Sequence, residues 1–411
     1  MYNIIKIAYR NLIRQTKRTL LTVSIIILGV ISVLVFSSLT GAFKDLMIGE
    51  ITDSVLGHIQ IHRKGYVSSI DNLPLNKTFN EKQIKKIKEI LDKNENIEAY
   101  SFRILFGGML SNYAETTNVK LVAIHPEQEL KTLPLLEKRL EKGEFLQAEG
   151  ILIPDLIARG FKVNLKDSIV LVANNKEGSV NGLPLKLNGI VKSIPGPAGK
   201  FGYVKIKDAA SILRMNKPEY NEIVIRLKNL SKLEKIKKEL DAEIGSILGK
   251  NDKPMFEVHT WEQLSPFSNI ADMIDLMAFF IKIILVVIVL ISIMNVMIMS
   301  VYERTKEIGT IAAIGTLPGK ILMLFVTEGT MLGLFGVISG SILGTILILI
   351  LKMIKPVIAF GRSDNIVLIP EIPFNDMWVI GIIILLVAVI GAFGPALKAS
   401  KLEPIKAIRN S

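Results

Sequence analysis

The segment "VYERTKEIGTIAAIGTLPGK" (301–320) joins two of the most apolar stretches of the chain. The stretch "FFIKIILVVIVLISIMNVMIMS" (279–300) precedes it, and "ILMLFVTEGTMLGLFGVISGSILGTILILIL" (321–351) follows it. A helix that crosses a bilayer needs about 20 consecutive apolar residues, and both flanking stretches reach that length. The pattern therefore predicts that 301–320 is a short polar connection between two membrane helices.

The composition of the whole chain agrees with a place in a membrane. Half of the 411 residues are hydrophobic, and the mean hydropathy is +0.42. An average soluble domain is less apolar. We predict membrane helices at 19–41, 273–301, 321–351 and 377–397. The predicted fold class is a membrane α-helical protein with four transmembrane helices and a large extracytoplasmic mixed α/β domain, residues 42–272, inserted between helices 1 and 2.

The basic residues predict how these helices are oriented. Residues 1–18 contain five Lys or Arg and no acid, and the tail 398–411 contains four basic residues against Glu403. Short loops rich in Lys and Arg stay on the cytoplasmic side. We therefore expect both termini and 302–320 to be cytoplasmic, and the loop 352–376 to be external. The expected location is the bacterial inner (cytoplasmic) membrane, with several passes through it.

The N-terminal segment and the exterior domain have their own patterns. Apolar and basic residues separate onto two faces in 1–18, which predicts an amphipathic elbow helix at the membrane surface, or else a plain basic flank. In the exterior domain we expect an outer subdomain, about 126–218, inserted into an inner one. Helices are predicted at 80–91 and 231–248, where Asn80 and Ser231 serve as N-caps.

Several kinds of chemistry are absent from the sequence pattern. The chain has no cysteine, and the net charge of +12 owes much to the cytoplasmic segments, so we expect no nucleic acid as partner. His58 and His62 are spaced like metal ligands on a helix. They lie in a predicted strand, however, where that spacing separates them by roughly 13 Å, so we expect ordinary surface histidines. Each Gly-Lys pair has Ile where a phosphate-binding loop has its first Gly, and none is followed by Ser or Thr, so the sequence contains no such loop. We expect no catalytic, cofactor or metal site in this chain.

Polar and small residues within the membrane helices are candidates for a structural or functional role. A charged or amide side chain in a bilayer is costly unless it has a partner. The candidates are Lys282, which we expect to extend to the outer surface, and Asn295 and Glu328, which flank the connection 302–320. Spaced glycines let helices approach closely, either within one chain or across a dimer, and the third helix has Gly333, Gly336, Gly340 and Gly344.

The connection 302–320 combines mixed charges with a compact apolar side. Four of its five charged residues, 303, 304, 306 and 307, fall within little more than one helical turn, and Pro318 with Gly319 is expected to break the helix. Such a short helix suits docking into a cleft of a cytoplasmic partner, whereas the alternative is a solvated turn. Because the chain has no nucleotide-binding motif, we expect ATP and Mg²⁺ to bind to a separate ATPase.

At this point the sequence resembles a known family. "MNVMIMSVYERTKEIGTIAAIG" is similar to the signature segment of the FtsX-like ABC transporter permease superfamily, and "FVTEGTMLGLFGVISGSILG" is similar to its third helix. "IAYRNLIRQTKRTLLT" and "PALKASKLEPIKAIRN" resemble its two ends. Within the superfamily, "GHIQIHRKGY" (57–66) and "VHTWEQLSP" (258–266) look most like the lipoprotein-releasing (LolC/LolE-type) permeases, with MacB-type permeases next.

The resemblance implies a mechanism and a set of partners. The expected partners are a cytoplasmic ABC ATPase dimer, a second permease chain, the membrane, a lipoprotein, and a periplasmic chaperone or adaptor. A type VII (mechanotransmission) permease would move its exterior domain to release lipoproteins. The alternatives are macrolide or peptide efflux of the MacB type, and FtsX-like regulation of a cell-wall hydrolase. Implied ATPase-coupling residues are Glu303, Arg304, Lys306, Glu307, Ile308, Gly309 and Gly315. A candidate chaperone-contacting loop contains Asn174, Lys176, Glu177, Leu183 and Pro184.

Overall fold

The computed structural model describes residues 2–14, 16–147, 149–193, 201–248, 253–265, 267–360 and 363–403. The chain divides into two compact units. One, which we call the helical unit, combines Met1–Leu46 with Asp272–Ser411, and the other, the α/β unit, is Met47–Ala271. The boundary at residue 46 falls inside one helix, α2 (Thr16–Ile51).

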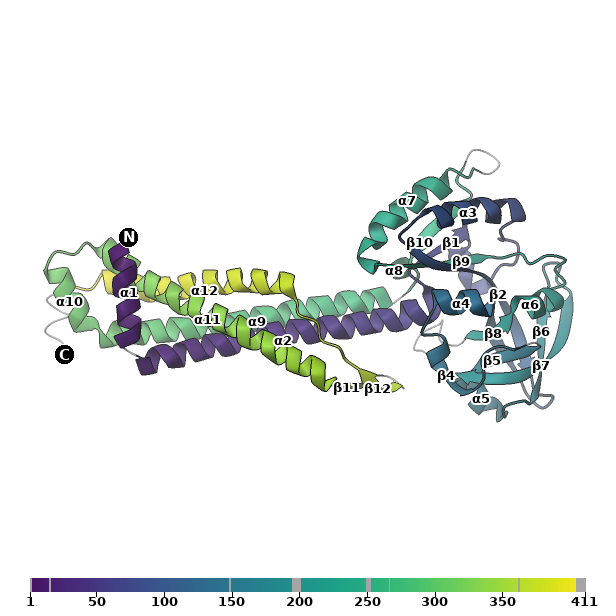
Figure 1. Cartoon of the computed structure of the whole chain (residues 1–411), viewed down its shortest axis with the longest axis horizontal. Helices are drawn as coiled ribbons and strands as arrows, with labels where there is room; N and C mark the ends of the chain where they lie inside the picture. Colours follow the sequence, from purple (N-terminus) through teal and green to yellow (C-terminus); the bar gives the residue numbers. More distant parts are fainter. Residues whose placement is uncertain are drawn as a thin grey trace. The chain divides into compact units, whose positions relative to one another are not determined.

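Long apolar helices make up the helical unit. Its elements are α1 (Tyr2–Arg14), α2 (Thr16–Ile51), α9 (Phe267–Glu303), α10 (Thr305–Ala313), α11 (Pro318–Ile354), α12 (Phe374–Ser400), and a hairpin of β11 (Val357–Phe360) and β12 (Ser363–Val367). Within the described residues, four helices are long and apolar enough to cross a membrane, as the sequence predicted. Figure 1 shows α1 lying across α11, near the start of that helix.

Each of the four candidate membrane helices extends beyond its predicted bounds. The largest difference is in α2, which was predicted to end at residue 41 and continues to Ile51. Residues Gly41–Ile51 include Lys44, Asp45 and Glu50. The apolar run therefore ends near residue 41, although the helix continues. Helix continuity depends on backbone hydrogen bonds rather than on apolar side chains, and Lys and Glu are good helix formers.

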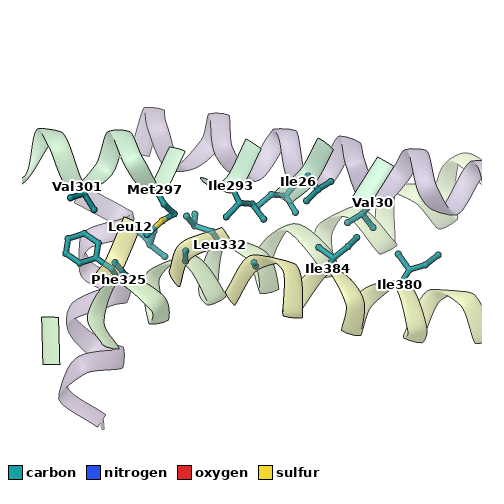
Figure 2. Close-up of a cluster of buried hydrophobic side chains, with 14 of the residues drawn as sticks. Leu12, Ile26, Val30, Ile293, Met297, Val301, Phe325, Leu332, Ile380 and Ile384 are labelled. Carbon is teal, nitrogen blue, oxygen red and sulfur yellow. The ribbon is translucent and has the colours of Figure 1, made fainter. Parts of the chain in front are cut away.

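Buried aliphatic side chains hold the bundle together. Residues from α1, α2, α9, α11 and α12 meet in one cluster, in which Ile26, Ile293 and Ile384 are fully buried. Figure 2 shows these side chains pointing toward one another from the facing helices. Leu12 joins the same cluster from α1, so the elbow helix packs on the bundle through an apolar contact. Ile5 lies two turns before Leu12, on the same face of α1, and is 49% exposed.

One mixed sheet is the centre of the α/β unit. Among the described residues its strands are β1 (Ile59–Arg63), β2 (Ile97–Ser111), β3 (Thr116–Ile124), β4 (Leu140–Gly143), β5 (Gly150–Pro154), β6 (Ser168–Asn174), β7 (Val180–Val191), β8 (Phe201–Lys205), β9 (Glu222–Leu227) and β10 (Phe256–Thr260). The order is β10-β1-β9-β2-β3-β8-β5-β7-β4, and β6 pairs with β2 and β7. The pairs β3–β8 and β5–β7 are parallel, and the rest are antiparallel.

Short helices cover this sheet. They are α3 (Glu81–Lys93), α4 (Pro126–Thr132), α5 (Asp155–Phe161), α6 (Ile206–Ile212), α7 (Leu233–Gly245) and α8 (Trp261–Leu264). Figure 1 shows α3 and α7 together beside the β10–β1–β9 end of the sheet. The capping box of Asn80 and Gln83 is present as predicted. The prediction that Ser231 is an N-cap is wrong. The Asn229 side chain accepts a hydrogen bond from the Ser231 N–H and caps a 3₁₀ turn, and α7 begins after this turn, at Leu233.

Three hydrophobic clusters fill the α/β unit. The strand β2 contributes to each of them, through Phe102, Leu105 and Leu110. The predicted division into an outer and an inner subdomain stays a prediction, because the clusters share this strand.

Candidate functional site

The connection between α9 and α11 is a short helix with two sharp ends. Helix α9 ends at Glu303, and α10 occupies Thr305–Ala313. Gly315, with φ of +94°, then turns the chain, a conformation that glycine adopts without strain. The sequence suggested that Pro318 breaks a helix, and this is wrong. Pro318 occupies the first turn of α11, where its fixed φ and missing N–H favour a helix start.

Arg304 is the centre of a buried polar cluster at this connection. Its Nη1 donates to both carboxylate oxygens of Glu328, at 2.9 and 3.1 Å, and its Nε donates to Glu307 Oε2 at 3.0 Å. Its guanidinium carbon lies 5.3 Å from the ring centre of Phe325, a cation–π contact. Arg304 is 8% exposed and Glu328 is 3% exposed. The structure thus gives Glu328 the partner that a carboxylate in a membrane helix needs.

Asn11 brings the elbow helix into the same cluster. Its Nδ2 donates to Glu328 Oε1 at 2.6 Å, although 317 positions separate the two residues. The cluster therefore connects α1, α10 and α11 through one carboxylate. The sequence analysis missed Asn11, because one amide in a basic amphipathic helix carries no signal of a tertiary partner.

The other predicted coupling residues divide into buried and exposed ones. Ile308 and Gly309 are buried, and Ile308 packs into the core of the chain's own bundle. These two positions therefore support the segment, and they do not form its outer surface as we expected. Glu303, Lys306, Glu307 and Gly315 are exposed. Three further exposed apolar residues lie on this connection, namely Ile311, Ile314 and Leu317.

The surroundings of two polar residues predicted to lie in the membrane, Lys282 and Asn295, differ. Lys282 does not extend freely to the surface, because its Nζ lies 3.0 Å from Asp376 Oδ2. Ser37 of α2 donates to the same carboxylate, so α2, α9 and α12 are connected there. Asn295 lies on the exposed side of α9.

The glycines of α11 pack against other helices of the same chain. A Cβ atom on Gly336 would lie 2.3 Å from Ile26 Cγ2, and one on Gly340 would lie 2.7 Å from Val30 Cβ. Gly344 faces Leu34 in the same way. Gly333 instead faces Ala388 of α12, at 2.5 Å from the methyl carbon. The ridge predicted from the sequence is thus a contact between α11 and two neighbours within one chain.

The candidate partner loop is the turn between β6 and β7. Asn174 ends β6, whereas Leu183 and Pro184 lie within β7 and pair with β6. Lys176 and Glu177 are exposed in the turn. Lys176 donates to Glu219 at 2.8 Å, which lowers the pKa of that carboxyl despite its partial burial. The turn is therefore fastened to the segment before β9.

His58 and His62 are buried, so the expectation of surface histidines is wrong. His62 Nε2 lies 3.2 Å from Glu222 Oε2, and Arg103 donates to the other oxygen of that carboxylate at 2.8 Å. Burial alone would raise the pKa of Glu222, but His62 and Arg103 together hold it below its usual range. Within the described residues, no group of three or more His, Cys, Asp or Glu has the arrangement of a metal site.

Comparison with known proteins identifies the class. Residues 279–404 match the model of the FtsX-like permease C-terminal region, and residues 19–243 match the MacB-like periplasmic core domain. The second match alone covers more than half of the chain. The chain belongs to this family of ABC transporter permeases.

Individual relatives extend over most of the chain. An uncharacterized ABC transporter permease of Methanocaldococcus jannaschii is 26% identical, and the alignment covers 99% of this chain and 98% of the relative. The lipoprotein-releasing system transmembrane protein LolC of Xylella fastidiosa is 23% identical, over 70% of this chain and 71% of its own. The periplasmic region of MacB from Actinobacillus actinomycetemcomitans is 14% identical, over 53% of this chain and 92% of its own, with a TM-score of 0.34.

Proposed function

We propose that this chain is a mechanotransmission permease that carries movement from a separate cytoplasmic ABC ATPase dimer to an extracytoplasmic α/β domain. The observation that carries the proposal is the Arg304–Glu328–Asn11 cluster. It fastens the short helix α10 to α11 and to the elbow helix α1 by buried contacts. A push on α10 therefore acts on membrane helices rather than on a loose loop.

The proposed contact with the ATPase is the exposed side of the connection. Ile314 and Leu317 are 81% and 64% exposed, and Lys306 adds a charge beside them. Apolar residues with a charged rim are typical of protein interfaces. Glu307 already pairs with Arg304, so a partner's cation would share a carboxylate that has a role within this chain.

The proposed substrate is a lipoprotein or another lipid-linked molecule, released from the outer leaflet of the bacterial inner membrane. The name of the LolC relative supports this choice. The partners would then be a second permease chain and a periplasmic chaperone or adaptor. Macrolide or peptide efflux of the MacB type is a second candidate, supported by the match of 19–243, and regulation of a cell-wall hydrolase is a third. Co-purification with a lipoprotein or with a hydrolase separates the first from the third.

Replacing one exposed residue tests the proposed docking surface. Ile314→Glu places a charge at the centre of the surface without touching the buried cluster, so co-purification of the ATPase should fall at least about tenfold. Tyr113→Glu is the matched control, because Tyr113 is 77% exposed in the α/β unit. Equal ATPase recovery with both variants would place the docking surface elsewhere.

A further inference from the structure

A cavity on the helical unit lies where α1 meets α2 and where α9 ends. Its volume is about 820 Å³, within the range of small-molecule sites. The wall contains the basic residues Arg14 and Lys17, the apolar residues Leu21, Val296 and Met299, and the amide of Asn295. The coupling mechanism proposed above uses none of these groups for contact with an ATPase.

The cavity is open toward the side that a bilayer would cover. Leu21 is 59% exposed and Met299 is 54% exposed, and both belong to helices long enough to span a membrane. The Arg14 side chain is 80% exposed, and its Nη1 lies 4.0 Å from Glu307 Oε1, at the limit of an ion pair. Two cations at the end of an apolar groove complement a molecule with an anionic head and a hydrocarbon body.

Asn295 is the residue that makes this site more than a basic flank. It lies in an apolar helix, two turns before the end of α9, and its side chain is exposed. Among the described residues, its amide makes no hydrogen bond to another side chain or to the backbone. A polar side chain at membrane depth is costly unless something pairs with it. A ligand with oxygen acceptors below its charged head would provide that partner.

We infer that this cavity binds an anionic phospholipid. Arg14 and Lys17 contact the phosphate, the Asn295 amide donates to a glycerol ester carbonyl, and Leu21, Val296 and Met299 contact the first part of an acyl chain. Glu303 also lines the cavity and has an interaction within the chain. Two basic residues, Arg14 and Lys17, stand against this one acid, so the lining has a net positive charge. The lipid would bridge the elbow helix and α9, next to the coupling segment.

Retention of lipid through gel filtration tests the site. The full-length permease, extracted in mild detergent, is loaded with phosphatidylglycerol or phosphatidylcholine, and bound lipid is measured by mass spectrometry. We expect phosphatidylglycerol to be retained preferentially. The double variant Arg14→Gln, Lys17→Gln should weaken its binding about 30-fold, since each basic residue near the headgroup contributes about 1 kcal/mol, or roughly a factor of five.

Matched variants separate a defined site from general attraction to charged lipid. Lys6→Gln, Arg10→Gln removes two exposed charges from the same helix, outside the cavity, and should leave retention within about twofold of the parent. Asn295→Leu should lower retention with no change of charge. Ser292→Leu is its control, because the Ser292 hydroxyl is already bonded to Ile288 O.

Two results would overturn the inference. Equal losses from the two double variants would mean diffuse electrostatic attraction only. Efficient disulfide formation between copies carrying Leu21→Cys and Met299→Cys, with no retained lipid, would mean that a second copy of the chain covers the cavity. Neither result depends on an ATPase, so the inference and the proposed function fail independently.

Discussion

At the residue scale, one buried carboxylate holds three elements together. Glu328 receives hydrogen bonds from Arg304 and Asn11, and it is almost fully buried. Removing one member of such a pair leaves an uncompensated charge, whereas removing both charges leaves an apolar contact of similar size. The consequence of each substitution therefore depends on what remains.

Glu328→Ala should be strongly destabilising. We expect a loss of about 3–5 kcal/mol in unfolding free energy, because the buried Arg304 guanidinium then keeps only the half-exposed Glu307 as a counter-charge. The double variant Arg304→Met, Glu328→Leu should recover most of that loss. Thermal unfolding in detergent checks both, and a double variant less stable than Glu328→Ala would contradict the account.

A second residue-scale prediction concerns acid. The pKa of Glu222 is lower in the folded protein than in the unfolded chain, since His62 and Arg103 outweigh its burial. Its contribution to stability is thus complete above the unfolded value of about 4.3 and is lost as the pH falls through the lower folded value. The decline of unfolding free energy on the acid side of the pH curve, which we call the acid limb, should be flatter in Glu222→Gln. Glu234→Gln, at an exposed position, is the control.

The tryptophans allow the acid limb to be followed in the α/β unit alone. The chain has two, of which Trp261 lies in α8 and Trp378 lies in α12. In a Trp378→Phe background, Trp261 fluorescence reports the α/β unit. Parallel acid limbs for Glu222→Gln and the parent would contradict the assigned role of Glu222.

At the element scale, the sequence predicted which helices exist better than where they end or what they touch. Hydropathy located the four candidate membrane helices of the described residues, because about 20 apolar residues are required to cross a bilayer. It missed the extension of α2 to Ile51, since Lys and Glu also favour a helix but are not apolar. It also missed the burial of His58 and His62. The carboxylate partner of His62, Glu222, lies on a distant strand, and the pairing of His58 with Asp53 requires the chain turn between α2 and β1.

Helix packing in the bundle depends on the absence of side chains along α11. Gly340→Leu would place its Cβ 2.7 Å from Val30 Cβ, so α2 and α11 must move apart. We expect the free energy of unfolding to fall by about 1–3 kcal/mol, which is the usual cost of overpacking in a protein core. Gly41→Leu is the control, because nothing lies within 4 Å of its Cβ position. Equal melting temperatures for the two variants would remove the ridge as a packing contact.

At the scale of the whole molecule, the family is shown, four candidate membrane helices lie among the described residues, and the orientation is a prediction. A cysteine can report it, because the chain has none of its own. Glu177→Cys lies in an exposed turn. It should react with an impermeant maleimide added outside intact cells. Reaction only after the cytoplasm is opened would reverse the predicted topology.

The central claim is that movement enters at α10 and reaches the α/β unit. Spin labels at Gly41→Cys and Glu177→Cys place one probe in each unit. Pulsed electron–electron resonance then measures the distance between them in the permease–ATPase complex, with and without ATP. The account predicts a shift in the distance distribution on adding ATP, and loss of that shift with Ile314→Glu. An unchanged distribution while the parent complex hydrolyses ATP would contradict it.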